Sequence, residues 1–218
     1  MLKYLFIFSL FSIIGWILEV TYKSITNKNI INPGLLIGCS VPLYGFGGVF
    51  LNILCNLLID INSNYKIILL FIISIILLTL LEYIIGKIIL KIFNIKFWDY
   101  SNLKLNYQGI ICLSFSLIWG ILSILFYYFI YPWLDNLSMT IINNSIGLFL
   151  LGIYYGIFII DIFVTIDLLN KLKKYSKGIH IIINIEKLKI SLSNNNKLLY
   201  KIYPYSIINK YIKEKISD

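Results

Sequence analysis

Five long apolar runs constrain this chain more than any other feature of its sequence. The third, residues 67–90, consists largely of Ile and Leu, and the others cover residues 2–20, 35–59, 109–131 and 146–169. A helix needs about 20 apolar residues to cross the hydrocarbon core of a bilayer. We therefore expect an all-α, polytopic integral membrane protein with about five transmembrane helices.

The composition argues against a soluble globular domain. Hydrophobic residues make up 59% of the 218 residues and charged residues 13%, whereas a soluble domain carries about 25% charged residues. All 19 basic residues are lysines, and the net charge is +9. We attribute this charge to codon bias and membrane topology and expect no nucleic-acid partner, because no basic domain with interleaved aromatic residues is present. The first run has no clean small-residue cleavage site, which favours a retained helix over a signal peptide.

The lysines also predict the orientation, because the cytoplasmic flanks of membrane spans collect them. Eleven lysines follow residue 169, four lie in segment 87–107 and two in segment 21–34, while segment 132–145 has none. Five spans fit this bias if the N-terminus is outside and the Lys-rich C-terminal tail is inside. A re-entrant segment at Pro42 would change the parity.

Two regions follow from this topology. Residues 1–170 form the predicted helical transmembrane domain, and residues 171–218 form a basic cytoplasmic tail. In the tail, residues 179–185 have the pattern of a short strand, and residues 191–196 that of a polar turn. Lysines and tyrosines in the tail are suited to contact with anionic lipid.

Three carboxylates in or beside the apolar runs are candidates for function. Glu19 lies at the inner end of the first run and can pair with Lys23 one turn later. Glu82 and Asp161 lie inside the third and fifth runs, where a charged carboxylate costs on the order of 3 kcal/mol or more. Two interpretations stay open for each of these two: a hydrogen bond that holds helices together, or a site that binds a proton or cation. Because the chain has no arginine, Asp161 needs lysine, backbone groups, hydroxyls or a proton of its own.

The second run contains a predicted helix break. Pro42 removes a backbone donor and clashes with the preceding turn of a helix, and Tyr44 and Gly45 follow it. Bared carbonyls are tolerated in a membrane only against protein or water, and transporters use such broken helices as binding sites. The alternative is that glycines such as those of Gly34-x-x-x-Gly38 and Gly152-x-x-x-Gly156 only allow helices to pack closely.

A polar connector between the third and fourth runs is typical of a membrane–water interface, where aromatic rings lie at headgroup depth. Asp99 is a further functional candidate there. Supporting residues at the predicted inner face are Trp16, Trp98, Tyr100, Asn106 and Gln108. We expect Trp16, Glu19, Trp98 and Asp99 to gather at the cytoplasmic helix ends.

Catalytic and cofactor motifs are missing from the sequence. It has no phosphate-binding loop G-x-x-x-x-G-K-[ST], no H-E-x-x-H, no Cys-x-x-Cys and no nucleophile elbow. We expect no enzyme activity, cofactor or metal site.

The chain resembles the putative ABC-transporter type IV, or CmpB-type, family of small bacterial multi-span membrane proteins. The resemblance covers roughly residues 5–165. Its blocks are IGWILE at 14–19, the segment 32–48 with PLYG at its core, LEY at 81–83, WDYS at 98–101, NYQGIICL at 106–113 and WG at 119–120. The chain departs from the family at Pro33, Cys39 and Ile110, where the family has Arg, Pro and a basic residue.

The resemblance implies a transport permease of the bacterial cytoplasmic membrane. ATP hydrolysis would then come from a separate nucleotide-binding subunit, and a homo-oligomer stays open. The alternative is a non-transport membrane protein that organises or regulates a partner through its inner loops and tail.

The topology can be tested by cysteine labelling from outside the cell. A probe near Asn136 should react, and one near Asn102 or in the tail should not, because of the lysine bias. External labelling at Asn102 would overturn the five-span topology.

Overall fold

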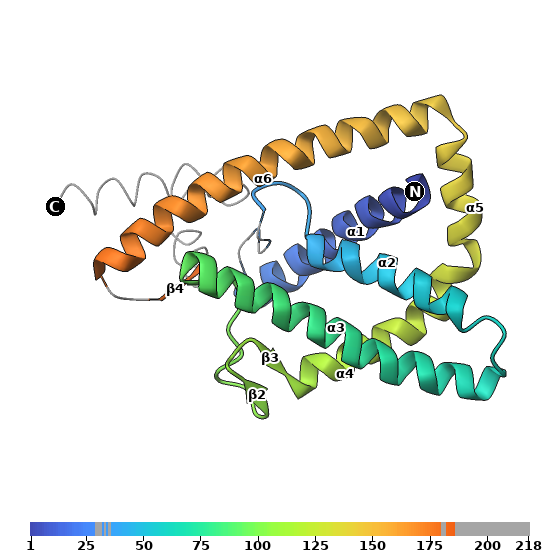
Figure 1. The fold of residues 1–218 in the computed structure, drawn as a ribbon, viewed down its shortest axis with the longest axis horizontal. Coiled ribbons are helices and arrows are strands. Elements are labelled where there is room, and N and C mark those ends of the chain that lie inside the picture. The colour runs from blue at the N-terminus through green and yellow to red at the C-terminus, as the bar shows by residue number, and fades with distance from the viewer. Residues whose placement is uncertain (29–31, 33, 35, 180–181, 186–218) are drawn as a thin grey trace. The chain divides into compact units, whose positions relative to one another are not determined.

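Within the residues that the structure describes, the protein is all-α apart from four two-residue strands. The computed structural model describes residues 1–28, 32, 34, 36–179 and 182–185. The helices are α1 (Leu2–Asn27), α2 (Pro42–Leu57), α3 (Ser63–Phe93), α4 (Leu113–Leu125), the π-helical turn η1 (Phe126–Ile130), α5 (Tyr131–Ile142) and α6 (Ser145–Ile179) (Figure 1). The strands are β1 (Ile95–Lys96), β2 (Asn106–Tyr107), β3 (Ile111–Cys112) and β4 (Ile183–Asn184).

The chain forms two compact units, which we describe separately. The first unit comprises Met1–Ser12, Pro42–Ile85 and Tyr100–Tyr154. The second comprises Ile13–Val41, Gly86–Asp99 and the chain from Tyr155 onward. Helices α1, α3 and α6 each contribute residues to both.

In the described part of the chain, four helical stretches are long and apolar enough to cross a membrane. They are Leu2–Asn27, Tyr65–Phe93, Leu113–Ile142 and Ser145–Lys174. The predicted span 35–59 contains only the 16-residue helix α2, which is roughly 24 Å long at 1.5 Å per residue. The predicted count of five spans is therefore not confirmed.

The predicted break at Pro42 is the start of a helix. Pro42 is the first residue of α2, and residues 36–41 before it are not helical. Proline suits a first helical position, because its missing N–H has no acceptor there and its φ is already helical. Residues 36–41 of the predicted span 35–59 are therefore not helical, and the break expected at Pro42 takes the form of a helix start.

The fourth predicted span is displaced along the chain. Residues 106–112 contain the antiparallel pair β2–β3, so the helix begins at Leu113 and not at residue 109. At its far end Pro132 does not close the helix. It lies in the first turn of α5, directly after the π-helical turn η1, where its missing donor is tolerated. The predicted 132–145 loop is thus mostly helix, and Figure 1 shows α5 at a steep angle to α4.

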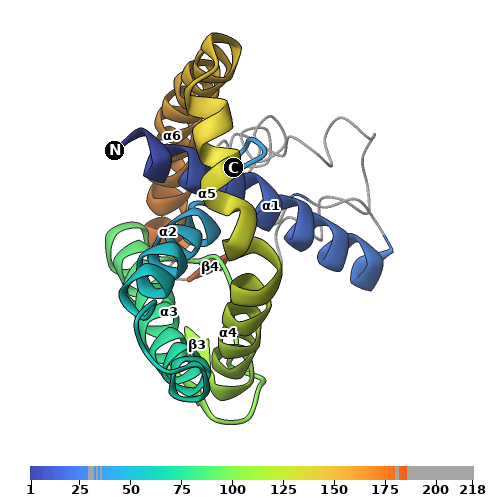
Figure 2. The same cartoon turned by 90° about the vertical axis from the view of Figure 1, so that its right-hand side faces the viewer.

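The core of the first unit is an apolar cluster between the start of α1, α2, α3 and the α4–α5 stretch. Helix α2 lies beside α3 in both ribbon views (Figures 1 and 2). The buried members of the cluster are Ile7, Phe11, Leu51, Leu54, Cys55, Leu58, Leu70, Leu78, Phe126 and Leu134. The Lys3 ammonium pairs with the Asp135 carboxylate at 2.7 Å and ties the start of α1 to α5.

Glycines let these helices approach closely. A Cβ at Gly45 would collide with the Ser12 hydroxyl and lie 2.8 Å from the Phe8 carbonyl oxygen. A Cβ at Gly120 would lie 2.6 Å from Phe71 Cε2. By contrast, no described atom lies within 4 Å of a Cβ at Gly152. Gly45 and Gly120 therefore allow close packing of helices. Gly152 has no such close neighbour among the described residues.

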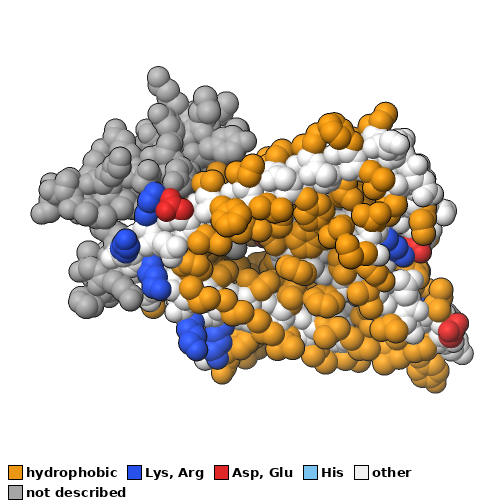
Figure 3. Space-filling model, turned by 45° about the horizontal axis from the view of Figure 1, so that its top comes forward, with side chains coloured by type: hydrophobic (Ala, Val, Ile, Leu, Met, Phe, Trp, Pro, Cys, Tyr) orange, Lys and Arg blue, Asp and Glu red, His pale blue; other side chains and the backbone are white. Residues whose placement is uncertain are grey.

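On the face seen in Figure 3, apolar side chains cover much of the described part of the protein. In the candidate span Ser145–Lys174, only 6% of the most apolar window is buried. This surface suits hydrocarbon, where exposed Leu, Ile and Phe side chains cost nothing.

The second unit contains a short contact between distant parts of the chain. Strand β4 pairs in parallel with β1, with Ile183 opposite Ile95 and Asn184 opposite Lys96. The strand predicted within residues 179–185 is confirmed at Ile183–Asn184, and α6 continues past the predicted boundary at residue 170 to Ile179. The predicted turn at 191–196 and the tail tyrosines lie outside the described residues.

Gly45→Ala should destabilise the first unit by about 1–3 kcal/mol, because its methyl group overpacks the contact with α1. The measurement is the thermal unfolding midpoint in mild detergent. The matched control is Gly152→Ala, which should be neutral or stabilising, because alanine favours a helix by about 1 kcal/mol over glycine. Equal midpoints for the two variants would contradict the packing assigned to Gly45.

Candidate functional site

Glu82 is buried inside α3 and binds two aromatic donors. Its side chain is only 3% exposed. The Tyr100 hydroxyl donates to Oε1 at 2.9 Å, and the Trp119 indole N–H donates to Oε2 at 3.2 Å. The carboxylate thus joins α3, the loop after residue 99 and α4, all within the first unit.

Aromatic rings surround these donors. The Tyr44 ring from α2 meets Trp119 edge-on, with 5.4 Å between centroids, and the Tyr100 ring stacks on Phe115 at 4.7 Å. Phe115 and Trp119 are four residues apart on α4 and therefore share a helix face. We call Tyr44, Glu82, Tyr100, Phe115 and Trp119 the Glu82 cluster.

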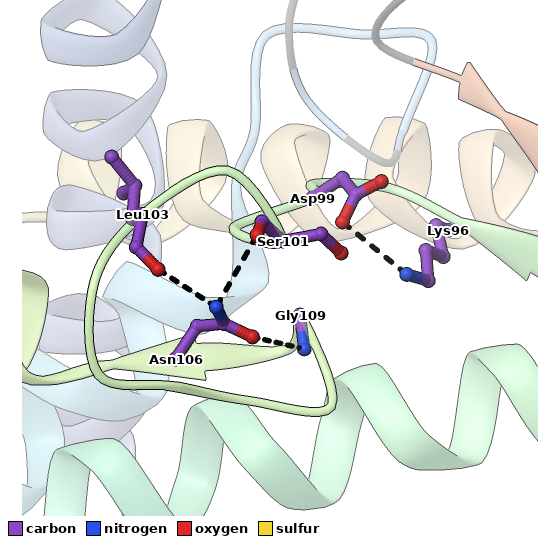
Figure 4. Close-up of polar contacts among 6 residues, drawn as sticks. All are labelled: Lys96, Asp99, Ser101, Leu103, Asn106 and Gly109. Atoms are coloured by element: carbon purple, nitrogen blue, oxygen red, sulfur yellow. Dashed lines mark hydrogen bonds and ion pairs between the residues drawn. The ribbon is translucent and has the colours of Figure 1, made fainter.

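Asn106 folds the connector that carries Tyr100 (Figure 4). Its Nδ2 donates to the carbonyl oxygens of Ser101 at 3.3 Å and Leu103 at 2.7 Å, and its Oδ1 accepts the Gly109 N–H at 3.1 Å. The Tyr100 N–H donates to the Gly109 carbonyl at 2.8 Å. The loop 100–112 is therefore a defined structure that fixes Tyr100.

Gln108 supports the same loop from its other side. Gln108 adopts a positive φ of 55°, next to Gly109 at 68°, and its Oε1 accepts the Tyr83 hydroxyl at 3.4 Å. The Tyr83 and Tyr107 rings lie 5.7 Å apart. Asn106 and Gln108, expected to support a site, thus hold the loop that bears Tyr100.

Asp161, in the second unit, binds the non-helical segment before α2. Its Oδ1 accepts the Ile37 N–H and its Oδ2 the Gly38 N–H, both at 2.9 Å. The Thr165 hydroxyl donates to Oδ1 at 3.3 Å. Backbone groups and a hydroxyl therefore satisfy this carboxylate. A Cβ at Gly38 would lie 2.7 Å from Oδ2, so glycine allows the approach.

Asn32 holds the same segment and was missed as a candidate. Its Oδ1 accepts the Trp16 indole N–H at 3.1 Å and the Gly34 N–H at 3.3 Å, and its Nδ2 donates to the Ile37 carbonyl at 2.7 Å. A buried indole needs an acceptor, so a polar residue near Trp16 was to be expected. Asn32 is the first residue of the block 32–48 that carries the family resemblance, and this position could have identified it as a candidate.

The remaining candidates have separate positions. Pro42 begins α2, and Gly45 packs against α1. Asp99 pairs with Lys96 at 3.2 Å (Figure 4), and Trp98 beside it is half-buried.

Glu19 is half-buried in α1. Its pairing with Lys23 stays a prediction, and so does its gathering with Trp16, Trp98 and Asp99. The structure brings Tyr44, Glu82 and Tyr100 together, and it adds Phe115 and Trp119, which the search for polar residues overlooked. Within the described residues no group of three His, Cys, Asp or Glu side chains could hold a metal ion.

Comparison with known families decides the identity. A family model described as Putative ABC-transporter type IV matches residues 6–166. The chain belongs to this family. The match confirms the resemblance seen in the sequence blocks and supports a transport-related membrane protein, and all twelve candidate residues lie within it. Comparisons with curated proteins and with solved structures gave no match.

Asp161→Asn should loosen the segment before α2. Each Asp161 oxygen accepts a backbone N–H. In Asp161→Asn the side-chain NH₂ replaces one of these acceptors and faces a backbone donor, which should cost about 1–3 kcal/mol of stability. The reporter is Cys39, which is exposed, whereas Cys55 and Cys112 are buried.

Thiol modification of Cys39 should therefore be faster in Asp161→Asn than in the unchanged protein. The control is Asp167→Asn on the same helix, which removes the carboxylate of an exposed pair with Lys171. An unchanged Cys39 rate in Asp161→Asn would contradict the anchoring role.

Proposed function

We propose that this chain is the membrane-spanning permease subunit of an ABC-type transport system. The observation that carries the proposal is the family match over residues 6–166. The sequence contains no phosphate-binding loop, so a separate nucleotide-binding subunit would hydrolyse ATP.

We further propose a multi-pass protein of the bacterial cytoplasmic membrane with the N-terminus outside and the tail inside. The lysine bias supports this orientation. So does the ion pair between Lys3 and Asp135, because it requires the start of α1 and the start of α5 to face the same side. An odd number of membrane crossings between Lys3 and Asp135 would put the two residues on opposite sides of the membrane. In the proposed topology α1, α2, α3 and α4 each cross once, and this even number returns the chain to the side on which it began.

Helix α2 would complete its crossing with the non-helical segment 36–41. Such backbone is tolerated at membrane depth only if its polar groups have partners in the protein. Asp161 and Asn32 supply such partners for Ile37 and Gly38. Asp161 itself lies near the middle of the candidate span Ser145–Lys174. A broken helix of this kind is typical of transporters.

The loop 100–112 is the proposed contact for the nucleotide-binding subunit. It is on the inner side in this topology, and residues 101–105 are exposed. Its shape is held by the three Asn106 hydrogen bonds and the β2–β3 pair. A rigid loop can transmit the movement of a partner subunit to the helices that it joins, whereas a flexible loop cannot.

The test is co-expression with a nucleotide-binding subunit encoded beside this chain. The two should purify as a complex, and reconstitution with the wild-type chain should change the rate of ATP hydrolysis. Asn106→Ala should weaken this effect severalfold, because each lost hydrogen bond costs about 1 kcal/mol. The control is Thr140→Ala, whose hydroxyl bonds only to its own helix. Failure of the wild-type pair to associate would favour a partner-organising membrane protein without transport.

A further inference from the structure

The Glu82 cluster contains a carboxylate without a counter-charge. Both oxygens of Glu82 are bound by neutral donors, and the described residues place no ammonium within ion-pair distance of it. The titratable side chains that other elements bring to the cluster are Tyr44 and Tyr100. Along α3 itself, Tyr83 bonds to Gln108, and Lys87 is exposed.

The two donors differ in what they can do. The Trp119 indole N–H can only donate, so Oε2 must remain an acceptor. The Tyr100 hydroxyl can donate or accept. If Oε1 carries a proton, Glu82 can donate that proton to the Tyr100 oxygen while Oε2 still accepts from Trp119. The same heavy-atom positions therefore satisfy both the ionised and the protonated carboxyl group.

A route for the proton lies next to the cluster. Tyr100 is itself half-buried and is followed directly by the exposed residues 101–105, so solvent comes close to the residue that donates to Oε1. We propose that Glu82 is a reversible proton-binding site. A proton from water adds to Oε1, the Tyr100 hydroxyl changes from donor to acceptor, and loss of the proton reverses both changes.

The chemistry of the cluster fits a proton and not a metal cation. Hard cations take about six oxygen ligands. Here the indole N–H occupies Oε2, and the rings of Tyr44 and Phe115 pack against the two residues that donate to Glu82. Among the described residues, only the Tyr100 hydroxyl adds a further oxygen at hydrogen-bond distance from Glu82.

Protonation also reaches the loop 100–112. Tyr100 bonds through its backbone to Gly109, and Asn106 bonds to Gly109 in turn. The direction of the hydrogen bond between Glu82 and Tyr100 therefore links the protonation state of Glu82 to the loop 100–112. This site goes beyond the permease assignment and requires neither a substrate nor a partner.

Infrared difference spectroscopy of the full-length protein in lipid vesicles tests the proposal. With ¹³C-labelled glutamate, the carbonyl stretch of a protonated glutamic acid is identified by its isotope shift. We expect this band to grow reversibly as the pH is lowered and to fade as the pH is raised. It should be absent from Glu82→Gln and present in the matched variant Glu19→Gln.

Glu82→Gln should fold, because its carbonyl can accept from Trp119 while its NH₂ donates to the Tyr100 oxygen. Tyr100→Phe is the second variant. It should keep the glutamic acid band but move its frequency, because the carboxyl proton loses its acceptor. A band that survives in Glu82→Gln, or no titrating band at any pH at which the protein stays folded, would overturn the proposal. So would a band that responds to sodium at constant pH.

Discussion

A polar group in hydrocarbon must find its partner within the protein, because lipid tails neither donate nor accept hydrogen bonds. Two carboxylates impose this constraint most strongly. Glu82 is met by a hydroxyl and an indole N–H, and Asp161 by two backbone amides and a hydroxyl. Each carboxylate therefore gathers segments that are distant in sequence. Glu82 fixes the loop after α3 to α4, and Asp161 fixes the segment before α2 to α6.

The two sites differ in their chemistry. Asp161 accepts hydrogen bonds from backbone N–H groups, which can only donate. Both of its carboxylate oxygens must therefore act as acceptors. Its role is to hold the non-helical segment against the middle of α6. Glu82 faces one fixed donor and one reversible donor. This difference separates an anchor from a candidate for proton exchange, although both are carboxylates within apolar runs. Around them, packing depends on glycines such as Gly45 and Gly120, because lipid supplies no hydrophobic force between helices.

Much of this could be predicted from the sequence. The all-α class follows from the apolar runs, and the family follows from short blocks whose order is specific. The errors arose where backbone chemistry overrides hydropathy. Hydropathy made residues 36–41 part of a span, but Pro42 starts a helix. It assigned residues 109–112 to a helix, where Cys112 pairs with Asn106 in the β2–β3 hairpin. Pro132 was expected to end the fourth helix, but it lies in the first turn of α5, directly after the π-helical turn η1.

The sequence by itself determined that Glu82 and Asp161 lie within apolar segments and that each needs a partner, because both facts depend only on composition along the chain. It could not determine which partners they have. Trp119 lies 37 residues from Glu82, and Ile37 lies 124 residues from Asp161. Such pairings follow from helix packing and from the path of the loops. Only the tertiary structure therefore decided that one carboxylate binds backbone amides and the other binds a hydroxyl that can both donate and accept.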